Sequence, residues 1–194
     1  MSNAHTLIDR DDSLLIVIDV QEYFLNKLPS ASHTQLLNNI CWLIKLAGWC
    51  DIPLLITAEE HHKLPVAQRL IDTLPDNTPI YNKLIFGLAH QPNLLNKVRE
   101  TGRKTAILVG LETDVCVMHS ALGLLEAGYR VAVVLDAVGT PAPNQTIGIG
   151  RMQQAGVLIL NMKGIFYEWL RTVKRVNRFH QEMPHMRTLA GIIL

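Results

Sequence analysis

The residue best placed for covalent chemistry is Cys116, which lies where an expected strand gives way to an expected helix. Residues 106–109 are apolar and suit a buried strand, and a glycine follows them. Thr113 or Asp114 can cap the next helix, which Gly128 ends. Cys116 then falls in the first helical turn, where free amides and the helix dipole favour a thiolate. This position suits a nucleophile, but it equally suits a small buried core residue.

Two charged side chains are expected beside this cysteine. Asp19 ends an apolar run at residues 14–18, and Lys83 leaves a short strand expected at residues 79–82. A carboxylate that ends a buried strand must find a partner or shift its pKa. An ammonium group would lower the pKa of a thiol, and a carboxylate could take the thiol proton and return it to a leaving amine. Taken singly, Asp19 could cap a turn and Lys83 could be a solvated surface residue.

These residues must be positioned by a set of alternating strands and helices. Strands are expected at residues 14–18, 53–57, 79–82, 106–109, 131–135 and 157–160. Helices are expected at residues 32–48 (with Ser32 and Gln35 as a capping box), 65–70, 93–100, 113–128, 144–155 and 165–173. This alternation predicts an α/β fold with three layers, doubly wound, whose six-stranded sheet is mostly parallel. In the common order 3-2-1-4-5-6, Asp19 and Cys116 meet at the carboxyl edge, and Lys83 reaches in beside them.

Length and composition narrow the classes of function. A chain of 194 residues supports one domain, predicted at residues 1–173, and a C-terminal tail at residues 174–194. The net charge of +1 argues against nucleic acid as the main partner. No apolar run approaches the roughly 20 residues that span a bilayer, and no signal-peptide pattern opens the chain, so no membrane partner is expected.

Two further features concern compartment and assembly. The three cysteines, Cys41, Cys50 and Cys116, form neither a disulfide framework nor a Cys-x-x-Cys metal motif, which favours a reducing, cytoplasmic setting. The tail ends in an apolar run at residues 189–194, which is either disordered or buried against another subunit. We therefore expect a homo-oligomer.

Three segments together resemble the isochorismatase-like cysteine hydrolases, a family that includes nicotinamidases and other small-amide hydrolases. The segments are Ile-Asp-Val-Gln-Glu-Tyr-Phe at 18–24, Asn-Lys-Leu-Ile-Phe at 82–86 and Gly-Leu-Glu-Thr-Asp-Val-Cys-Val at 110–117. Their order and spacing fit the family, and the resemblance covers about residues 14–173. Members that hydrolyse isochorismate itself lack the cysteine, so Cys116 places this chain with the cysteine hydrolases.

The resemblance implies a catalytic triad of Asp19, Lys83 and Cys116. It implies hydrolysis of a small-molecule amide, or a related C–N bond, through a thioester on Cys116 and without a cofactor. It also implies a non-proline cis peptide between Leu111 and Glu112, which aims the amides of Glu112 and Cys116 at the substrate carbonyl oxygen as an oxyanion hole. The family expectation for assembly is again a homo-oligomer.

The substrate pocket is expected to include Gln21, Phe24 and Phe86, which lie in the resembling segments. The family's lysine segment often continues Phe-Ser-x-Phe, whereas this chain has Phe-Gly-Leu-Ala at residues 86–89. The second aromatic residue of that pattern is therefore absent here.

A metal site is the less favoured interpretation of another segment. Nicotinamidases carry a metal on an Asp-x-His motif after the second strand, and the nearest match here is Glu59-Glu60-His61, with His62 and His90 as further candidates. Glutamate and histidine are competent ligands, but ligand spacing has a high false-positive rate, so we favour a polar lid loop. No metal is predicted.

Other interpretations remain open beside the hydrolase. One is a catalytically silent interaction protein that keeps the fold, and another is a metal-assisted amidase that uses residues 59–62. His119 could form a dyad with Cys116, but we favour a packed or interface histidine because helical side chains project toward the helix start. The pair Gly148 and Gly150 lacks the third glycine of a dinucleotide-binding loop.

Overall fold

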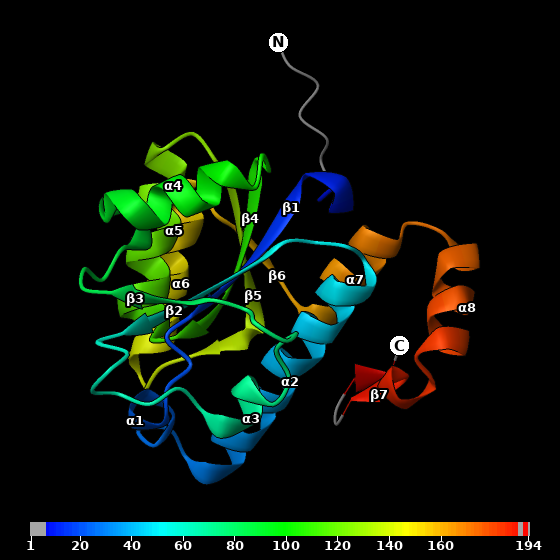
Figure 1. Cartoon of the computed structure of the whole chain (residues 1–194), viewed down its shortest axis with the longest axis horizontal. Coiled ribbons are helices and arrows are strands. Elements are labelled where there is room, and N and C mark those ends of the chain that lie inside the picture. Colours follow the sequence, from blue (N-terminus) through cyan, green and yellow to red (C-terminus); the bar gives the residue numbers. More distant parts are fainter. Residues whose placement is uncertain (1–6, 190–191, 194) are drawn as a thin grey trace.

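A six-stranded parallel sheet in the order β3-β2-β1-β4-β5-β6 forms the centre of the computed structural model, which describes residues 7–189 and 192–193 (Figure 1). Every neighbouring pair in this sheet is parallel. The predicted strand order is thus confirmed, and the sheet is fully parallel. Its strands are β1 Ser13–Ile18, β2 Leu54–Glu59, β3 Ile80–Lys83, β4 Thr105–Leu111, β5 Arg130–Gly139 and β6 Leu158–Leu160.

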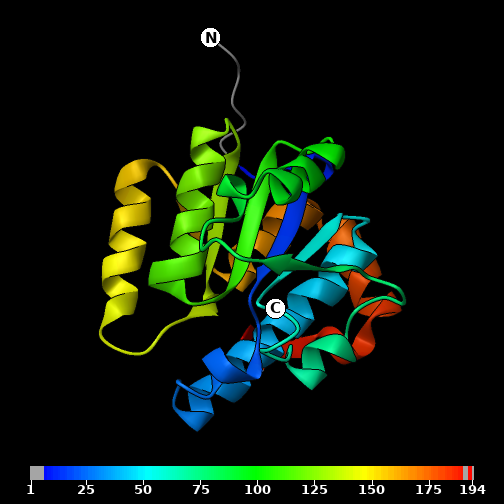
Figure 2. The same cartoon turned by 60° about the vertical axis from the view of Figure 1, so that its left-hand side comes forward.

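Helices cover both faces of the sheet, with α2 and α7 on one face and α4, α5 and α6 on the other (Figures 1 and 2). The helices are α1 Glu22–Leu25, α2 Ser30–Trp49, α3 Gln68–Ile71, α4 Pro92–Glu100, α5 Met118–Glu126, α6 Asn144–Ala155, α7 Met162–Leu170 and α8 Val173–Glu182. Within the part of the chain that the structure describes, no helix combines the length and the hydropathy needed to cross a bilayer.

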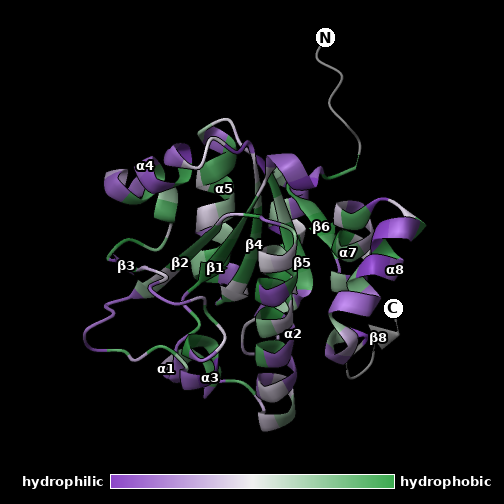
Figure 3. Ribbon diagram, turned by 45° about the vertical axis from the view of Figure 1, so that its right-hand side comes forward, coloured by the Kyte–Doolittle hydropathy of each residue, from purple (hydrophilic) through white to green (hydrophobic). Residues whose placement is uncertain are grey.

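Strand β1 shows how the sheet divides the core into two halves. Leu15 and Val17 pack in the cluster that contains α2 and α7, whereas Leu14, Ile16 and Ile18 pack in the cluster that contains α4, α5 and α6. Because successive strand residues point to opposite faces, a strand covered on both faces must be apolar throughout. Figure 3 shows the apolar strands inside and polar residues on the outer turns of the helices.

The start of α2 differs from the prediction. The helix begins at Ser30, directly after Pro29, and no side chain caps it. The predicted capping box is therefore wrong, because Ser32 lies inside the first turn. Gln35 instead donates a hydrogen bond to Asn39 Oδ1 at 2.8 Å, one turn further along. Proline fixes its own φ near the helical value, so the helix can start immediately after it.

Strand β5 is longer than predicted, because it does not end at Asp136. Its pairing with β4 shifts register between Leu108 and Gly110, and it resumes with Gly110 beside Val138 and Leu111 beside Gly139. Such a bulge places extra residues on one strand and lets pairing continue past them. Asp136 lies within this irregular part of β5, so a polar residue there does not mark the strand end.

The predicted last helix, residues 165–173, is in fact two helices. Helix α7 ends at Leu170, Arg171 adopts a positive φ of 62°, and Thr172 caps α8 by accepting a hydrogen bond from the Arg175 N–H. Phe179 of α8 is buried against aromatic rings of α2 and α7, so the segment after residue 173 shares the core. A short hairpin, β7 Thr188–Leu189 and β8 Ile192–Ile193, follows, and the predicted apolar run 189–194 lies partly outside the described residues.

Candidate active site

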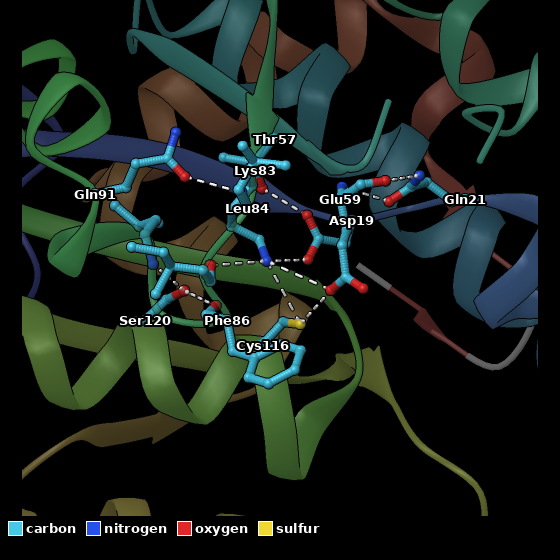
Figure 4. Close-up of polar contacts among 12 residues, drawn as sticks. Asp19, Gln21, Thr57, Glu59, Lys83, Leu84, Phe86, Gln91, Cys116 and Ser120 are labelled. Carbon is cyan, nitrogen blue, oxygen red and sulfur yellow. Dashed lines mark hydrogen bonds and ion pairs between the residues drawn. The ribbon is translucent and has the colours of Figure 1, made fainter. Parts of the chain in front are cut away.

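Four polar side chains meet at the carboxyl edge of the sheet (Figure 4). Asp19 directly follows β1, Glu59 is the last residue of β2, Lys83 is the last residue of β3, and Cys116 follows β4. Because all strands of a parallel sheet end at the same edge, adjacent strands bring these groups together. The structure therefore unites the three predicted triad residues and adds Glu59 to them.

Asp19 is fully buried, and two polar side chains contact its carboxylate. Its Oδ2 lies 2.8 Å from Lys83 Nζ, and its Oδ1 accepts a hydrogen bond from Thr57 Oγ1 at 2.9 Å. Thr57 is the partner of Ile18 in the β1–β2 register, which places the hydroxyl beside the strand end. Burial raises the pKa of the Asp19 carboxyl, and the Lys83 ammonium and the hydrogen bonds oppose this rise.

Lys83 is fully buried and its ammonium group links the site. Nζ lies 3.6 Å from Cys116 Sγ and 3.8 Å from Glu59 Oε2, and it donates a hydrogen bond to the Ile85 carbonyl oxygen at 3.3 Å. Burial by itself would lower the pKa of this ammonium, but the charge of Asp19, its hydrogen bond and the charge of Glu59 raise the pKa above its ordinary value. Lys83 is therefore a cation, and not a proton acceptor, at neutral pH.

Cys116 lies in a π-helical turn, Thr113–Val117 (η3), that runs into α5. No side chain caps this turn, so the predicted cap by Thr113 or Asp114 is wrong. The Asp114 carboxylate instead accepts a hydrogen bond from the Thr140 hydroxyl at 2.6 Å, which ties the turn to the end of β5. Cys116 is still in the first turn of the helical segment, with its thiol 3.5 Å from a carboxylate oxygen of Glu59.

The protonation state of Cys116 differs from the expectation. Burial raises the pKa of the thiol, the negative charge of Asp19 raises it further, and Lys83 lowers it only in part. The expected depression of the pKa by Lys83 and the helix start is therefore outweighed by desolvation. The resting site holds a thiol beside a carboxylate of raised pKa, and such a carboxylate is a better proton acceptor than an ordinary aspartate.

The backbone between β4 and the cysteine turn is tightly constrained. Gly110 has a φ of 121°, and a Cβ there would collide with the Ile18 carbonyl, so only glycine allows β1 and β4 to approach here. The Leu111–Glu112 peptide is cis, as the family resemblance implies. The Glu112 carboxylate pairs with Lys27 at 2.9 Å, which anchors this peptide from the side of α1.

The three predicted pocket residues have different surroundings. Gln21 is buried, and its amide is used to bind the backbone of Glu59 and Leu64. Phe24 is also buried and belongs to the core beneath the sheet. Phe86 is 52% exposed and meets the ring of His119 edge-on, with 6.1 Å between ring centroids. Of the three, Phe86 is therefore the side chain that is largely open to solvent.

Sequence reasoning missed several supporting residues. Thr57 could have been identified from the sequence, because it is a polar residue near the end of a buried strand, and such a residue needs a partner. Asp19 directly follows the neighbouring strand and supplies that partner. Gln91 could not have been identified in this way: it holds the lysine segment by accepting a hydrogen bond from Leu84 N and donating one to Asn82 O, across a loop. Ser120 Oγ similarly accepts from Leu88 N at 3.1 Å. Both support the loop that follows β3.

The metal interpretation of residues 59–62 does not fit the described residues. Among them, one group has ligand-like spacing, and it consists of Asp19, Glu59 and Cys116, without a histidine. Its candidate ligand atoms are 2.8–3.8 Å from Lys83 Nζ, so the ammonium already occupies the position of a cation. The side chains of His61 and His62 are exposed outside this group. Residues 59–62 therefore do not form a histidine-containing ligand group within the part of the chain that the structure describes.

The comparisons with known sequences cover most of the chain. A family model described as "Isochorismatase domain" matches residues 13–163. This range includes Asp19, Glu59, Lys83 and Cys116. The Escherichia coli protein called probable hydrolase YcaC is 26% identical over 197 residues, which cover 97% of this chain and 95% of that protein.

Solved structures give the same result. The Escherichia coli YcaC gene product, described as an octameric hydrolase of unknown specificity, has a TM-score of 0.82 at 25% identity and covers 96% of this chain and 95% of its own. Pseudomonas aeruginosa YcaC, solved with hexane-2,5-diol and covalent acrylamide, has a TM-score of 0.83 at 25% identity, with 95% and 96% covered. The MAR1 ribonuclease from Caenorhabditis elegans has a TM-score of 0.83 at 25% identity, with 97% and 98% covered. The family model, the relatives and the sheet order agree with one another. This chain belongs to the isochorismatase family of hydrolases.

Proposed function

We propose that this chain is a cysteine hydrolase that cleaves a small-molecule amide, or a related C–N bond, through a thioester on Cys116. One observation carries the proposal: the buried Lys83 ammonium lies 2.8 Å from Asp19 Oδ2 and 3.6 Å from Cys116 Sγ. Burying an ion pair is costly, and apolar side chains of similar volume would serve stability as well or better. An ion pair that contacts a thiol is therefore better explained by catalysis than by a contribution to stability.

In the first half of the reaction, Asp19 takes the proton of the Cys116 thiol, and the sulfur attacks the carbonyl carbon of the amide. The carbonyl oxygen becomes an oxyanion, and the backbone N–H groups of Glu112 and Cys116 donate hydrogen bonds to it. When the C–N bond breaks, Asp19 returns the proton to the leaving nitrogen. The products of this half are an amine, or ammonia, and a thioester on the sulfur.

In the second half, water attacks the thioester carbonyl while Asp19 takes one of its protons. The C–S bond then breaks, the carboxylic acid leaves, and the proton returns to the sulfur of Cys116. Lys83 stays protonated throughout, because its surroundings raise its pKa. Its charge stabilises the developing thiolate in the first half and Asp19 in both halves.

A structural neighbour supports the presence of a reactive nucleophile. Acrylamide is a small primary amide that also reacts with nucleophiles, and it is covalently bound in Pseudomonas aeruginosa YcaC, which matches this chain at 25% identity. The octameric state of Escherichia coli YcaC supports the prediction of a homo-oligomer here. The three free cysteines support the proposed cytoplasmic setting, where thiols stay reduced.

A second substrate class is suggested by the name of the Caenorhabditis elegans neighbour, a ribonuclease. Nucleic acid binding depends on a concentrated basic surface, and this chain carries a net charge of +1. The group nearest the thiol on its exposed side is also a carboxylate, Glu59, which would repel phosphate. We therefore keep a small-molecule substrate as the proposal.

The test is a panel of small primary amides, with ammonia release as the readout. Cys116→Ala is expected to lower the rate by about 10³-fold or more, because it removes the nucleophile. Cys50→Ala is the matched control, since Cys50 is another buried free thiol, and burial raises its pKa to about 12. Intact-protein mass spectrometry of the wild type with p-nitrophenyl acetate should show one acyl group on Cys116. Full activity in Cys116→Ala, or an acyl group elsewhere, contradicts the proposal.

A further inference from the structure

Of the four polar residues at the carboxyl edge, Asp19, Glu59, Lys83 and Cys116, Glu59 is the one that is partly open to solvent. Its side chain is 23% exposed, whereas those of Asp19 and Lys83 are 0% exposed. Its Oε2 lies 3.5 Å from Cys116 Sγ. Among the charged groups around the sulfur, this carboxylate is therefore the one that a ligand arriving from solvent can reach.

The positive charge of the site is shared unequally. Lys83 is shared by two carboxylates, and it lies 2.8 Å from Asp19 but 3.8 Å from Glu59. Within residues 7–189 and 192–193, the ion-pair partner of Glu59 is Lys83. Lys63, which is close to Glu59 in the sequence, forms its ion pair with Glu60 instead. The Lys83 ammonium therefore neutralises the buried Asp19 carboxylate at close range and the exposed Glu59 carboxylate less completely.

The backbone of Glu59 is held in place by the fold. The Glu59 N–H donates to Gln21 Oε1 at 2.7 Å, and Gln21 Nε2 donates to the Glu59 carbonyl oxygen at 2.8 Å. Glu59 is also the register partner of Lys83 in the β2–β3 pair. A backbone held this way keeps the base of the side chain beside Lys83 and Cys116, so the carboxylate starts from a fixed point near the thiol when a ligand arrives.

We propose that Glu59 is a specificity-determining residue that selects substrates with a positive charge or N–H donors beside the scissile bond and disfavours anionic ones. This inference rests on the proposed function and names the substrate class of that site. A carbonyl carbon that approaches Sγ brings its substituents beside Glu59 Oε2, where an N–H group can donate a hydrogen bond and a carboxylate is repelled. Carboxylates near a ligand path raise the local concentration of cations and lower that of anions.

The experiment compares three thiol reagents that share one chemistry and differ in charge. They are the cationic 2-aminoethyl, the neutral methyl and the anionic 2-sulfonatoethyl methanethiosulfonates. In each case the sulfur of Cys116 forms a disulfide bond with the reagent, and methanesulfinate leaves. Rates at Cys116 are read by peptide mass spectrometry and divided by the rates of the same reagents with 2-mercaptoethanol, which removes their intrinsic differences.

In the wild type, the corrected rates should fall in the order cation, neutral, anion, with a cation-to-anion ratio of about tenfold or more for a charge at this distance in a partly exposed site. Glu59→Gln keeps the side-chain shape and should reduce the ratio to about threefold or less. Glu60→Gln is the matched control, because Glu60 is the neighbouring carboxylate, is paired with Lys63 and should leave the ratio unchanged. Raising the salt concentration should shrink the wild-type ratio without any substitution.

The outcomes separate this inference from the proposed function. A corrected ratio near one in the wild type, or a ratio that survives Glu59→Gln, overturns the selective role of Glu59 and leaves the cysteine hydrolase intact. Equal slowing with all three reagents in Glu59→Gln assigns Glu59 to proton transfer and also overturns selectivity. Failure of all three reagents to label Cys116 overturns the proposed function, and the inference falls with it.

Discussion

Asp19 follows β1 and Asp136 lies in β5 of the same sheet, but the two carboxyl groups have different hydrogen-bond and ion-pair partners. Burial raises the pKa of both carboxyls. Asp19 faces an ammonium group and a hydroxyl, at 2.8 and 2.9 Å, beside a thiol. Asp136 is half-buried, and its Oδ1 accepts a hydrogen bond from the Met162 N–H at 2.8 Å, while its carbonyl oxygen accepts one from Asn39.

The difference teaches what marks a reactive carboxylate. Burial and a raised pKa are shared by the two residues, so neither property identifies the site. The neutral backbone donor at Asp136 joins β5 to the start of α7, which is a structural task. At Asp19 one partner is the Lys83 ammonium, which also lies beside the Cys116 thiol, so this carboxylate is placed where a proton can be exchanged with a reactive group. The following predictions test this comparison.

The largest effect is expected on catalysis. Asp19→Asn should lower the amidase or p-nitrophenyl acetate rate by about 10²–10⁴-fold, because an amide side chain cannot take the thiol proton. Asp136→Asn should leave kcat/KM within about threefold. The two variants are compared on the same substrate, with folding checked by thermal melts. Similar losses in both variants would show that the carboxylates contribute through structure, and the comparison would fail.

The second effect concerns stability. Lys83→Met leaves the buried Asp19 without its cation, and removal of one partner from a buried ion pair typically costs about 3–5 kcal/mol. We expect urea denaturation at pH 8 to show a loss of about 3 kcal/mol in the free energy of unfolding. The double variant Lys83→Met with Asp19→Asn should recover much of this loss, because no unpaired charge remains.

The sign of the pH dependence follows from the Asp19 pKa. Loss of Lys83 raises this pKa further in the folded state, so the folded protein binds the proton more tightly than the unfolded chain does. Stability then falls as pH rises above the ordinary aspartate pKa of about 3.9, until Asp19 ionises in the folded state. The deficit of Lys83→Met should therefore be smaller at pH 5 than at pH 8. An equal deficit at both pH values contradicts a role for the Asp19 charge.

A smaller effect is expected at Thr57. Thr57→Val removes a hydrogen bond to a charged acceptor, which is worth about 1.5–3 kcal/mol. It should also move the acidic limb of the pH–rate profile to higher pH, because this bond lowers the pKa of Asp19. Thr105→Val is the matched control, since Thr105 Oγ1 donates to Asp12 Oδ2 at the same 2.9 Å, at the opposite edge of the sheet. The control should lose stability without any shift of the profile.

The sheet order and the triad could be predicted because both follow from where apolar runs end. Asp19, Lys83 and Cys116 each lie at the carboxyl end of a run, and a parallel sheet collects such ends at one edge. The bulge in β5 could not be predicted, because Asp136 gives the same signal as a residue that ends its strand. A polar residue after an apolar run is thus ambiguous until the register is known.

The electrostatics of the site could not be predicted either. The Cys116 pKa depends on a balance between burial and the Lys83 charge, and sequence gives the residue types without the depth of burial. The sequence pattern predicts a loop that holds both Glu59 and His61, because the two residues are close along the chain. The structure instead keeps Glu59 in β2, where pairing with Lys83 points it at the thiol. Contacts across strands outweigh contacts along the chain at this edge.

The smallest effect is expected for the stability of Asp136→Asn, and it sharpens the comparison most. The asparagine Oδ1 can still accept the Met162 N–H, while the charge that burial penalises is gone. The folded pKa of Asp136 is raised, so the wild type loses stability as pH rises above the ordinary aspartate pKa, and the variant does not. Urea denaturation should therefore show the variant gaining on the wild type between pH 4 and pH 7, by up to about 1 kcal/mol. If the variant instead loses more than about 2 kcal/mol in the free energy of unfolding, the Met162 contact depends on the charge of Asp136, as expected for a hydrogen bond to an ionised group. Asp136 would then resemble Asp19, because both would need their ionised form.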